Sequence, residues 1–332
     1  MSAEDRSAEA GPVTAGPVTT RTATAGPGSA RLAPDGPSTA VRPALDWRDE
    51  RWPARANPVP AWLRFFNSEL RLVFGRARNL ALLGVLAIVP VLLGILLRVT
   101  IASSGGPGGP PFLNQLAGNG VFLALVVLTL TLTVLLLPLS VGVVSGDSIA
   151  GEAGHGTLRG LLTVPSGRTR LLAVKYTAIV VFSVASCLLV TVVSLVMGLI
   201  LFPSGPVTLL SGTTVSLGAG VLRVLVVTLF AAAAMASLGA IGLAASTMTQ
   251  HPVGAIAGVL IVTVASEICD QLPQLSAIHS YLPTHYWLTW DGLFRSPVDW
   301  SGVEHGLLSF ALYTVIFGAV AWAKLTSADI TS

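Results

Sequence analysis

Charged residues are scarce in this chain. Asp, Glu, Lys and Arg make up 11% of its 332 residues, and hydrophobic residues make up 52%. A typical soluble domain carries about 25% charged residues. The net charge of +3 is too small to indicate binding of nucleic acid. The composition therefore excludes an ordinary soluble enzyme and favours a membrane protein.

Cysteines and catalytic motifs are also few. The two cysteines, Cys187 and Cys269, lie within or near apolar runs, so we expect neither a disulfide nor a cysteine-based metal site. The sequence contains no GxxxxGK(S/T) phosphate loop, so this chain is not expected to hydrolyse ATP by that route. It also contains no GxSxG or HExxH motif. We therefore assign no catalytic residue, metal or cofactor to this chain.

Long apolar runs dominate the rest of the sequence. A helix that crosses a bilayer needs about 20 mostly apolar residues. Six runs reach or approach that length, at about 80–102, 120–144, 171–201, 220–246, 252–268 and 303–324. Residues 1–56 are instead rich in Pro, Gly, Ala and Thr and cannot bury enough surface to fold. We predict an all-α polytopic membrane protein, with a disordered tail (1–56) before a six-span transmembrane domain (57–332).

The loops between these runs predict an orientation. Cytoplasmic loops carry an excess of Lys and Arg. With the N-terminus inside, nine basic residues lie on the inner side and three on the outer side. The inner set is Arg64, Arg71, Arg76, Arg78, Arg159, Arg168, Arg170, Lys175 and Lys324, and the outer set is Arg98, Arg223 and Arg295. We therefore expect both termini to be cytoplasmic and the chain to lie in the plasma (inner) membrane.

Two further segments are apolar but do not read as spans. Residues 60–78 carry apolar side chains on one helical face and Arg64, Arg71 and Arg78 at seven-residue intervals on another. This pattern predicts an amphipathic helix in the inner headgroup region. Residues 267–302 combine six aromatic residues with three prolines. We expect short re-entrant helices there that dip into the outer leaflet and return.

A polar segment follows the second run. We expect Asp147 or Ser148 to cap a short cytoplasmic helix whose side chains Glu152, His155 and Arg159 face water. A membrane hydrolase that uses Glu152 and His155 is one alternative function. A solvated surface pair is the favoured interpretation, because one Glu and one His make an incomplete metal site.

A metal site or an ion-coupled transport mechanism would need polar residues on the outer side or within the spans. Three histidines and two acids are expected on the outer side, where ordinary solvation beside an aromatic belt is favoured over a weak metal site: His279, His285, His305, Asp270 and Glu304. No run has a charged residue at its middle, although ion-coupled transporters usually place some there. A self-sufficient secondary transporter is therefore disfavoured but remains the main rival.

The segment between the second and third runs resembles the membrane subunits of type-2 ABC transporters. Those proteins carry, in order, Gly-Glu, Gly-Thr-Leu, Leu-Leu, Pro, Ser-Arg, Leu-Leu and Lys. The corresponding residues here are Gly151-Glu152, Gly156-Thr157-Leu158, Leu161-Leu162, Pro165, Arg168, Leu171-Leu172 and Lys175. Two features depart from the pattern, because Gly154 and His155 replace basic residues and Gly167 separates Ser166 from Arg168.

The resemblance implies a permease that depends on partners. It implies a second permease copy, forming a homodimer in the lipid bilayer, and an ABC ATPase subunit that has a phosphate-binding loop and holds ATP and Mg. A cytoplasmic coupling helix between spans two and three would transmit movement of that ATPase. The implied coupling residues are Gly151, Glu152, Gly156, Thr157, Leu158, Arg159, Leu161 and Leu162. The family exports drugs, lipids and other cargo, so export is the expected direction.

Overall fold

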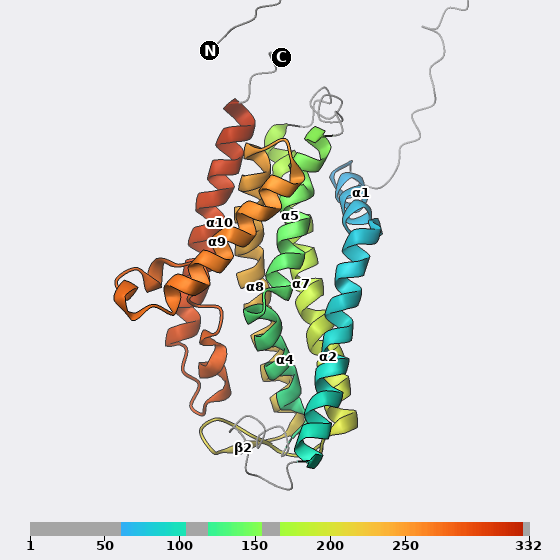
Figure 1. Cartoon of the computed structure of the whole chain (residues 1–332), viewed down its shortest axis with the longest axis vertical. Helices are drawn as coiled ribbons and strands as arrows, with labels where there is room; N and C mark the ends of the chain where they lie inside the picture. Colours follow the sequence, from blue (N-terminus) through green and yellow to red (C-terminus); the bar gives the residue numbers. More distant parts are fainter. Residues whose placement is uncertain (1–60, 104–118, 155–166, 328–332) are drawn as a thin grey trace, which may run out of the picture. The chain divides into compact units, whose positions relative to one another are not determined.

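The computed structural model describes residues 61–103, 119–154 and 167–327 (Figure 1). The α-helices are α1 (Ala61–Gly75), α2 (Ala77–Ser103), α4 (Val121–Thr133), α5 (Leu136–Gly154), α7 (Arg168–Leu201), α8 (Leu217–Met248), α9 (Pro252–Asp270) and α10 (Ser301–Ser327). Three short 3-10 helices, η1 (Pro273–Leu275), η2 (His279–Tyr281) and η3 (Thr289–Phe294), lie between α9 and α10. The predicted tail (1–56) lies outside the described residues.

The helices match the predicted runs. Five of them, α2, α7, α8, α9 and α10, are each long and apolar enough to cross a membrane. The helices α4 and α5 pass the same test together, so the described residues hold up to six spans. A short connection joins the fourth and fifth runs, since α8 ends at Met248 and α9 begins at Pro252. The polytopic all-α prediction is confirmed at this level.

The second span is bent by 54° between α4 and α5, although the apolar run predicted one continuous helix. Leu135, at the break, has a φ of 65°, in the left-handed region that a leucine rarely adopts. Pro138 follows three residues later and cannot donate an N–H to the carbonyl of Val134. A proline ring also clashes with the carbonyl four residues before it. Pro138 therefore explains why a continuous helix is disfavoured here.

The helix α8 is central, because it packs against α5, α7, α9 and α10. Its small residues allow these close contacts. A Cβ atom added to Gly242 would lie 1.9 Å from the Ser145 hydroxyl oxygen of α5, and one added to Gly239 would lie 2.5 Å from Ile179 of α7. Small residues let helix backbones approach each other in lipid. Glycine at these positions therefore sets the distance between α8 and its neighbours.

A hairpin and the 3-10 helices close one end of the helices. Strands β1 (Val207–Thr208) and β2 (Thr214–Val215) pair antiparallel, with Val207 opposite Val215. The Arg223 guanidinium of α8 donates hydrogen bonds to the carbonyls of Leu293 (2.7 Å) and Arg295 (2.9 Å), which fixes η3 against α8. The predicted outer helices between spans five and six are thus short 3-10 turns, and their depth in a membrane stays a prediction.

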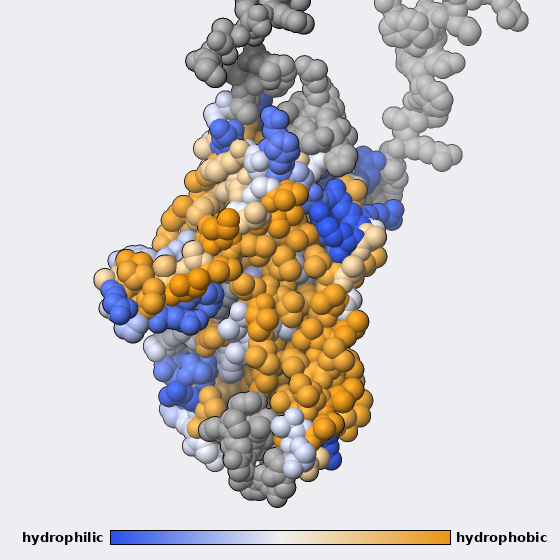
Figure 2. All heavy atoms as spheres, in the orientation of Figure 1, coloured by the Kyte–Doolittle hydropathy of each residue, from blue (hydrophilic) through white to orange (hydrophobic). Residues whose placement is uncertain are grey.

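Apolar side chains form much of the surface. Figure 2 shows a broad hydrophobic face between two ends that carry hydrophilic residues. Along α2, Ile88, Leu92, Leu96 and Val99 are 56–60% exposed. A contiguous exposed apolar surface of this kind marks contact with another molecule or with lipid. Together with the length of the helices, it indicates a multi-pass membrane protein.

The charged residues divide between the two ends. We call one of them the α1 end; it comprises α1, the starts of α2, α7 and α9, and the ends of α5, α8 and α10. It carries eight of the described basic residues, Arg64, Arg71, Arg76, Arg78, Arg168, Arg170, Lys175 and Lys324. The opposite end carries Arg98, Arg223 and Arg295. By the positive-inside rule we expect the α1 end to face the cytoplasm.

Candidate functional site

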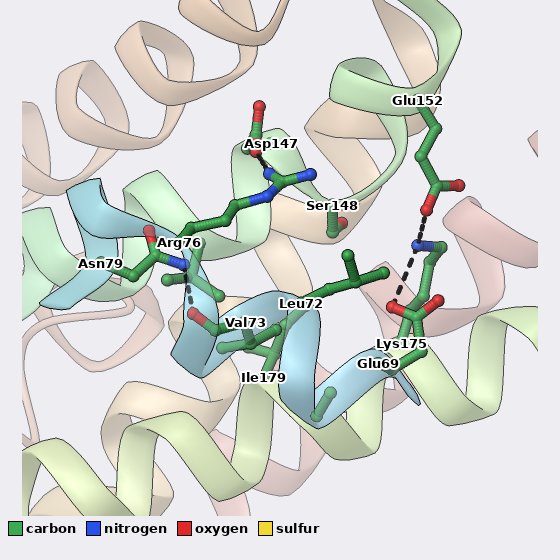
Figure 3. Close-up of a pocket in the computed structure, with 12 residues that line it drawn as sticks. Glu69, Leu72, Val73, Arg76, Asn79, Asp147, Ser148, Glu152, Lys175 and Ile179 are labelled. Atoms are coloured by element: carbon green, nitrogen blue, oxygen red, sulfur yellow. Dashed lines mark hydrogen bonds and ion pairs between the residues drawn. The ribbon is translucent and has the colours of Figure 1, made fainter. Parts of the chain in front are cut away.

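A group of charged residues meets where α1, α2, α5 and α7 come together at the α1 end (Figure 3). We call it the charge cluster, and its members are Glu69, Arg76, Arg78, Asp147, Glu152 and Lys175. They line or adjoin a small pocket, with a volume of about 30 Å³, that apolar residues such as Val144 and Ile179 also line. Because charges are scarce in this chain, six of them in one place is the most distinctive feature of the described structure.

Lys175, on the first turns of α7, is the centre of one half of the cluster. Its side chain is only 3% exposed. Its ammonium Nζ lies 2.6 Å from Oε1 of Glu152 on α5 and 3.3 Å from Oε2 of Glu69 on α1. A buried charge is tolerated only when it is paired and hydrogen-bonded. The ammonium therefore joins three helices, because both acids that satisfy it come from other elements.

The other half of the cluster joins the start of α2 to α5. Asp147 is 7% exposed, and one of its carboxylate oxygens accepts a hydrogen bond from Arg76 and lies 2.9 Å from the guanidinium of Arg78. Gly151 leaves room for this carboxylate, since a Cβ there would lie 2.6 Å from an Asp147 oxygen. Asn79 adds a hydrogen bond of 2.8 Å to the carbonyl of Val73 and holds the junction of α1 and α2.

The end of α5 is also fixed to α8. The backbone N–H groups of Ile149 and Ala150 donate to the Ser246 hydroxyl at 3.0 and 2.8 Å. One turn earlier, Gly146 lies against Ile256 of α9, because an added Cβ would be 2.9 Å from its backbone nitrogen. The last turns of α5 are therefore held by contacts with α2, α7, α8 and α9, and are linked to α1 through Lys175, so a displacement of this end would act on all of them.

Two predictions about this segment were wrong. Asp147 and Ser148 do not cap a new helix, because α5 runs without a break from Leu136 to Gly154. Glu152 does not simply face water, since it accepts a hydrogen bond from buried Lys175. The second difference arises because α7 packs beside α5 and brings Lys175 to Glu152, residues that are 23 positions apart in the sequence.

The predicted coupling residues are only partly described. Gly151 and Glu152 lie in the last turn of α5, next to the charge cluster. The remaining ones, Gly156, Thr157, Leu158, Arg159, Leu161 and Leu162, lie outside the described residues, as does His155. The coupling helix therefore stays a prediction, and so does the Glu152–His155 pair of the hydrolase alternative.

Sequence reasoning missed Glu69, Asp147 and Arg76 as members of one site. The signal that could have found Glu69 is that it is the one acidic residue in the amphipathic segment 60–78. An acid in an otherwise basic and apolar helix needs a cation from elsewhere in the fold. Lys175 was identified as a basic residue of the inner side and as the last residue of the family pattern, but not as the partner of an acid from another helix.

The opposite end holds a second, smaller polar group. Oδ1 of Asp270 lies 2.6 Å from Nδ1 of His285 and 4.0 Å from that of His279. His305 does not contact Asp270; its Nδ1 lies 2.6 Å from the carbonyl oxygen of Ser301. Among the described residues, no group of three or more His, Cys, Asp or Glu side chains is placed to hold a metal ion. The structure thus offers no support for the weak metal site considered from the sequence.

The free cysteines agree with the expectation of no disulfide. Cys187 is buried within α7, and Cys269 lies near the end of α9. Neither forms a disulfide, as expected from their positions in separate apolar runs.

Comparison with known proteins identifies the family. The model of the ABC-2 family transporter proteins matches residues 75–266, which is more than half of the chain. The matched range includes Arg76, Asp147, Glu152 and Lys175 of the charge cluster. No curated protein matches the chain. The described residues contain five to six apolar helices of membrane-spanning length. With this match, the chain belongs to the ABC-2 family of transporter proteins and is a multi-pass membrane permease.

Proposed function

We propose that this chain is the permease subunit of an ATP-driven exporter in the plasma (inner) membrane. It works as a pair of permease copies, with both termini in the cytoplasm. Separate ABC ATPase subunits hold ATP and Mg and dock at the α1 end. The cargo is a hydrophobic molecule such as a drug or a lipid. Family membership supports a partner ATPase. The charge cluster supports a specific route by which movement of that ATPase reaches the helices of the permease.

The observation that carries the proposal is the double pairing of Lys175. Glu152 lies two residues before the end of α5, directly ahead of the predicted coupling residues. It shares the buried ammonium with Glu69 of α1, at 2.6 and 3.3 Å respectively. Any movement of the coupling segment that shifts Glu152 therefore changes a contact that also holds α1 and α7.

The double pairing also keeps the free-energy cost of such a movement small. A buried ammonium that loses its single partner is destabilised by about 3–5 kcal/mol. If α5 moves and takes Glu152 away, Lys175 keeps its contact with Glu69. The ammonium charge is therefore neutralised both before and after the movement. The cluster can therefore exchange one ion pair without exposing an unpaired buried charge. A partner that binds the two arrangements with different affinity shifts their populations.

The test separates docking from coupling. The tagged full-length chain is purified in mild detergent from its native membrane, and copurifying proteins are identified and assayed for ATPase activity. We expect a stoichiometric ATPase that is lost when residues 156–162 are scrambled. Lys175→Met should retain the ATPase, because a side chain that is 3% exposed cannot be a docking contact, yet should abolish transport. A preparation without any ATPase would refute the proposal, and ion-gradient-driven transport would then be assayed.

The direction of transport is tested in inside-out vesicles, where an exporter takes up cargo when ATP is added outside. The matched control is Asp291→Asn, which removes an acid from an exposed ion pair with Arg295 at the opposite end. This variant should transport like the parent. Efflux of cargo from the same vesicles would contradict export.

A further inference from the structure

The exposed charges at the α1 end have one sign among the described residues. Arg64, Arg71, Arg170 and Lys324 are all exposed there. The acids of the same end do not offset them at the surface. Glu69 and Asp147 are 6% and 7% exposed, and the Glu152 side chain is 16% exposed and paired with Lys175. The acids are thus directed inwards, and the cations that face outwards keep their full charge.

Helix α1 carries two of these exposed cations on one face. Arg64 and Arg71 are seven residues apart and therefore lie on the same helical face. Neither forms an ion pair with another described residue. Leu63 and Leu72, 37% and 47% exposed, lie about 100° round the helix on either side of the arginines. The outward face of α1 therefore carries the two arginines together with exposed Asn67 and Ser68, and exposed leucines border it on both sides.

This combination fits one kind of surface. Exposed leucines favour the boundary between headgroups and acyl chains, and arginines at that level meet lipid phosphates. Guanidinium groups bind phosphate oxygens in a bidentate manner. An acidic soluble partner would satisfy the arginines but would leave the flanking leucines without an apolar environment. An uncharged leaflet would take the leucines but would not neutralise the arginines.

We propose that the outward face of α1 binds the headgroups of anionic phospholipids through Arg64 and Arg71. The opposite face of the same helix presents Glu69 to Lys175. An anionic leaflet therefore holds in place the helix that supplies one of the two acids of the Lys175 site. This proposal requires only that the chain lies in a membrane, and it is independent of the energy source of transport.

The experiment measures which lipids the full chain retains. The chain is reconstituted in vesicles with equal amounts of phosphatidylglycerol and phosphatidylcholine and extracted gently, and bound lipids are counted by native mass spectrometry. The parent should retain phosphatidylglycerol in excess. Each arginine near an anionic surface contributes about a fivefold preference. The two contributions multiply to about 25-fold, so the variant R64Q/R71Q should lose most of that excess. The variant R64K/R71K, which keeps both charges, should stay within about twofold of the parent.

The control is R295Q, which removes an exposed arginine at the opposite end. It should leave the lipid preference unchanged. Equal retention of both lipids by the parent would mean that α1 does not select anionic headgroups, and would overturn the proposal. An unchanged preference in R64Q/R71Q, or an equal loss in R295Q, would overturn it as well.

Discussion

Lys175→Met removes the cation from the centre of three helices and leaves Glu69 buried, with no described cation in its place. Glu69 is 6% exposed, and its Oε2 lies 3.3 Å from the Lys175 ammonium. At an effective dielectric constant of about 20, the gross attraction at that distance is about 5 kcal/mol. Desolvation offsets part of it, and removal of one partner from a buried pair costs about 3–5 kcal/mol net. Because the cluster lies at one end of the helices, we expect a cost near the lower limit, about 3 kcal/mol.

The structure also predicts how the cost is distributed between the partners. Glu69→Gln should be milder, about 1 kcal/mol, because the ammonium keeps Glu152 at 2.6 Å. The double variant Glu69→Gln, Lys175→Met should be more stable than Lys175→Met alone, since it removes the more buried of the two carboxylates that lose the ammonium. A gain in stability when Glu69→Gln is added to Lys175→Met is specific to a charge effect. Lost packing of the lysine side chain would instead make the double variant no better than the single one.

These differences are measured by thermal unfolding of the full-length chain in detergent. The readout is the fraction of protein that remains monodisperse after heating to each temperature. A loss of about 3 kcal/mol lowers Tm by roughly 6 °C or more for a domain of this size. Lys324→Met is a matched control, because Lys324 is the chain's other lysine and is exposed. A Lys175→Met variant as stable as the parent, or a double variant less stable than the single one, would refute the charge-cluster argument.

Three further predictions follow from particular contacts. An amine-reactive label on the parent chain should modify Lys175 at least about tenfold more slowly than Lys324, as read by peptide mass spectrometry, because only the former is buried; equal rates would contradict the buried site. Gly120→Ala should lower Tm, at a cost of about 1–3 kcal/mol, since the new methyl would lie 2.1 Å from a backbone oxygen of α7, whereas Gly218→Ala, with no atom within 4 Å, should not. Arg168→Gln should speed amide exchange in the last turn of α10 by about two- to fivefold. The guanidinium donates hydrogen bonds of 2.9 and 3.1 Å to two carbonyls there, and glutamine is too short to replace them. Unchanged exchange would show that those bonds do not hold the turn.

Much of the fold is readable from the sequence because bilayer-spanning helices leave a strong local signal. The run predicted at 220–246 is helical over Leu217–Met248, and the one at 303–324 over Ser301–Ser327. Length and hydropathy decide such elements without reference to any partner. The bend in the second span is an intermediate case. Its position depends on Pro138, a local signal that was present in the sequence, and on the left-handed Leu135, which only the folded backbone reveals.

The charge cluster belongs to a different class of information, because no stretch of sequence contains it. Glu69 and Lys175 are 106 positions apart, and Arg76 and Asp147 are 71 apart. Each residue taken alone has an ordinary local explanation: Glu69 on the wet face of an amphipathic helix, and Lys175 as one more inner cation. What the sequence did contain is a constraint. Each acid near the predicted inner side must either pair with a cation or stay in water. The sequence does not show which of the two applies to Glu69. The folded chain does, because Glu69 is buried there. The pairing of two acids with one lysine is therefore a property of how α1, α5 and α7 pack together, and the same packing would connect a movement of α5 to α1.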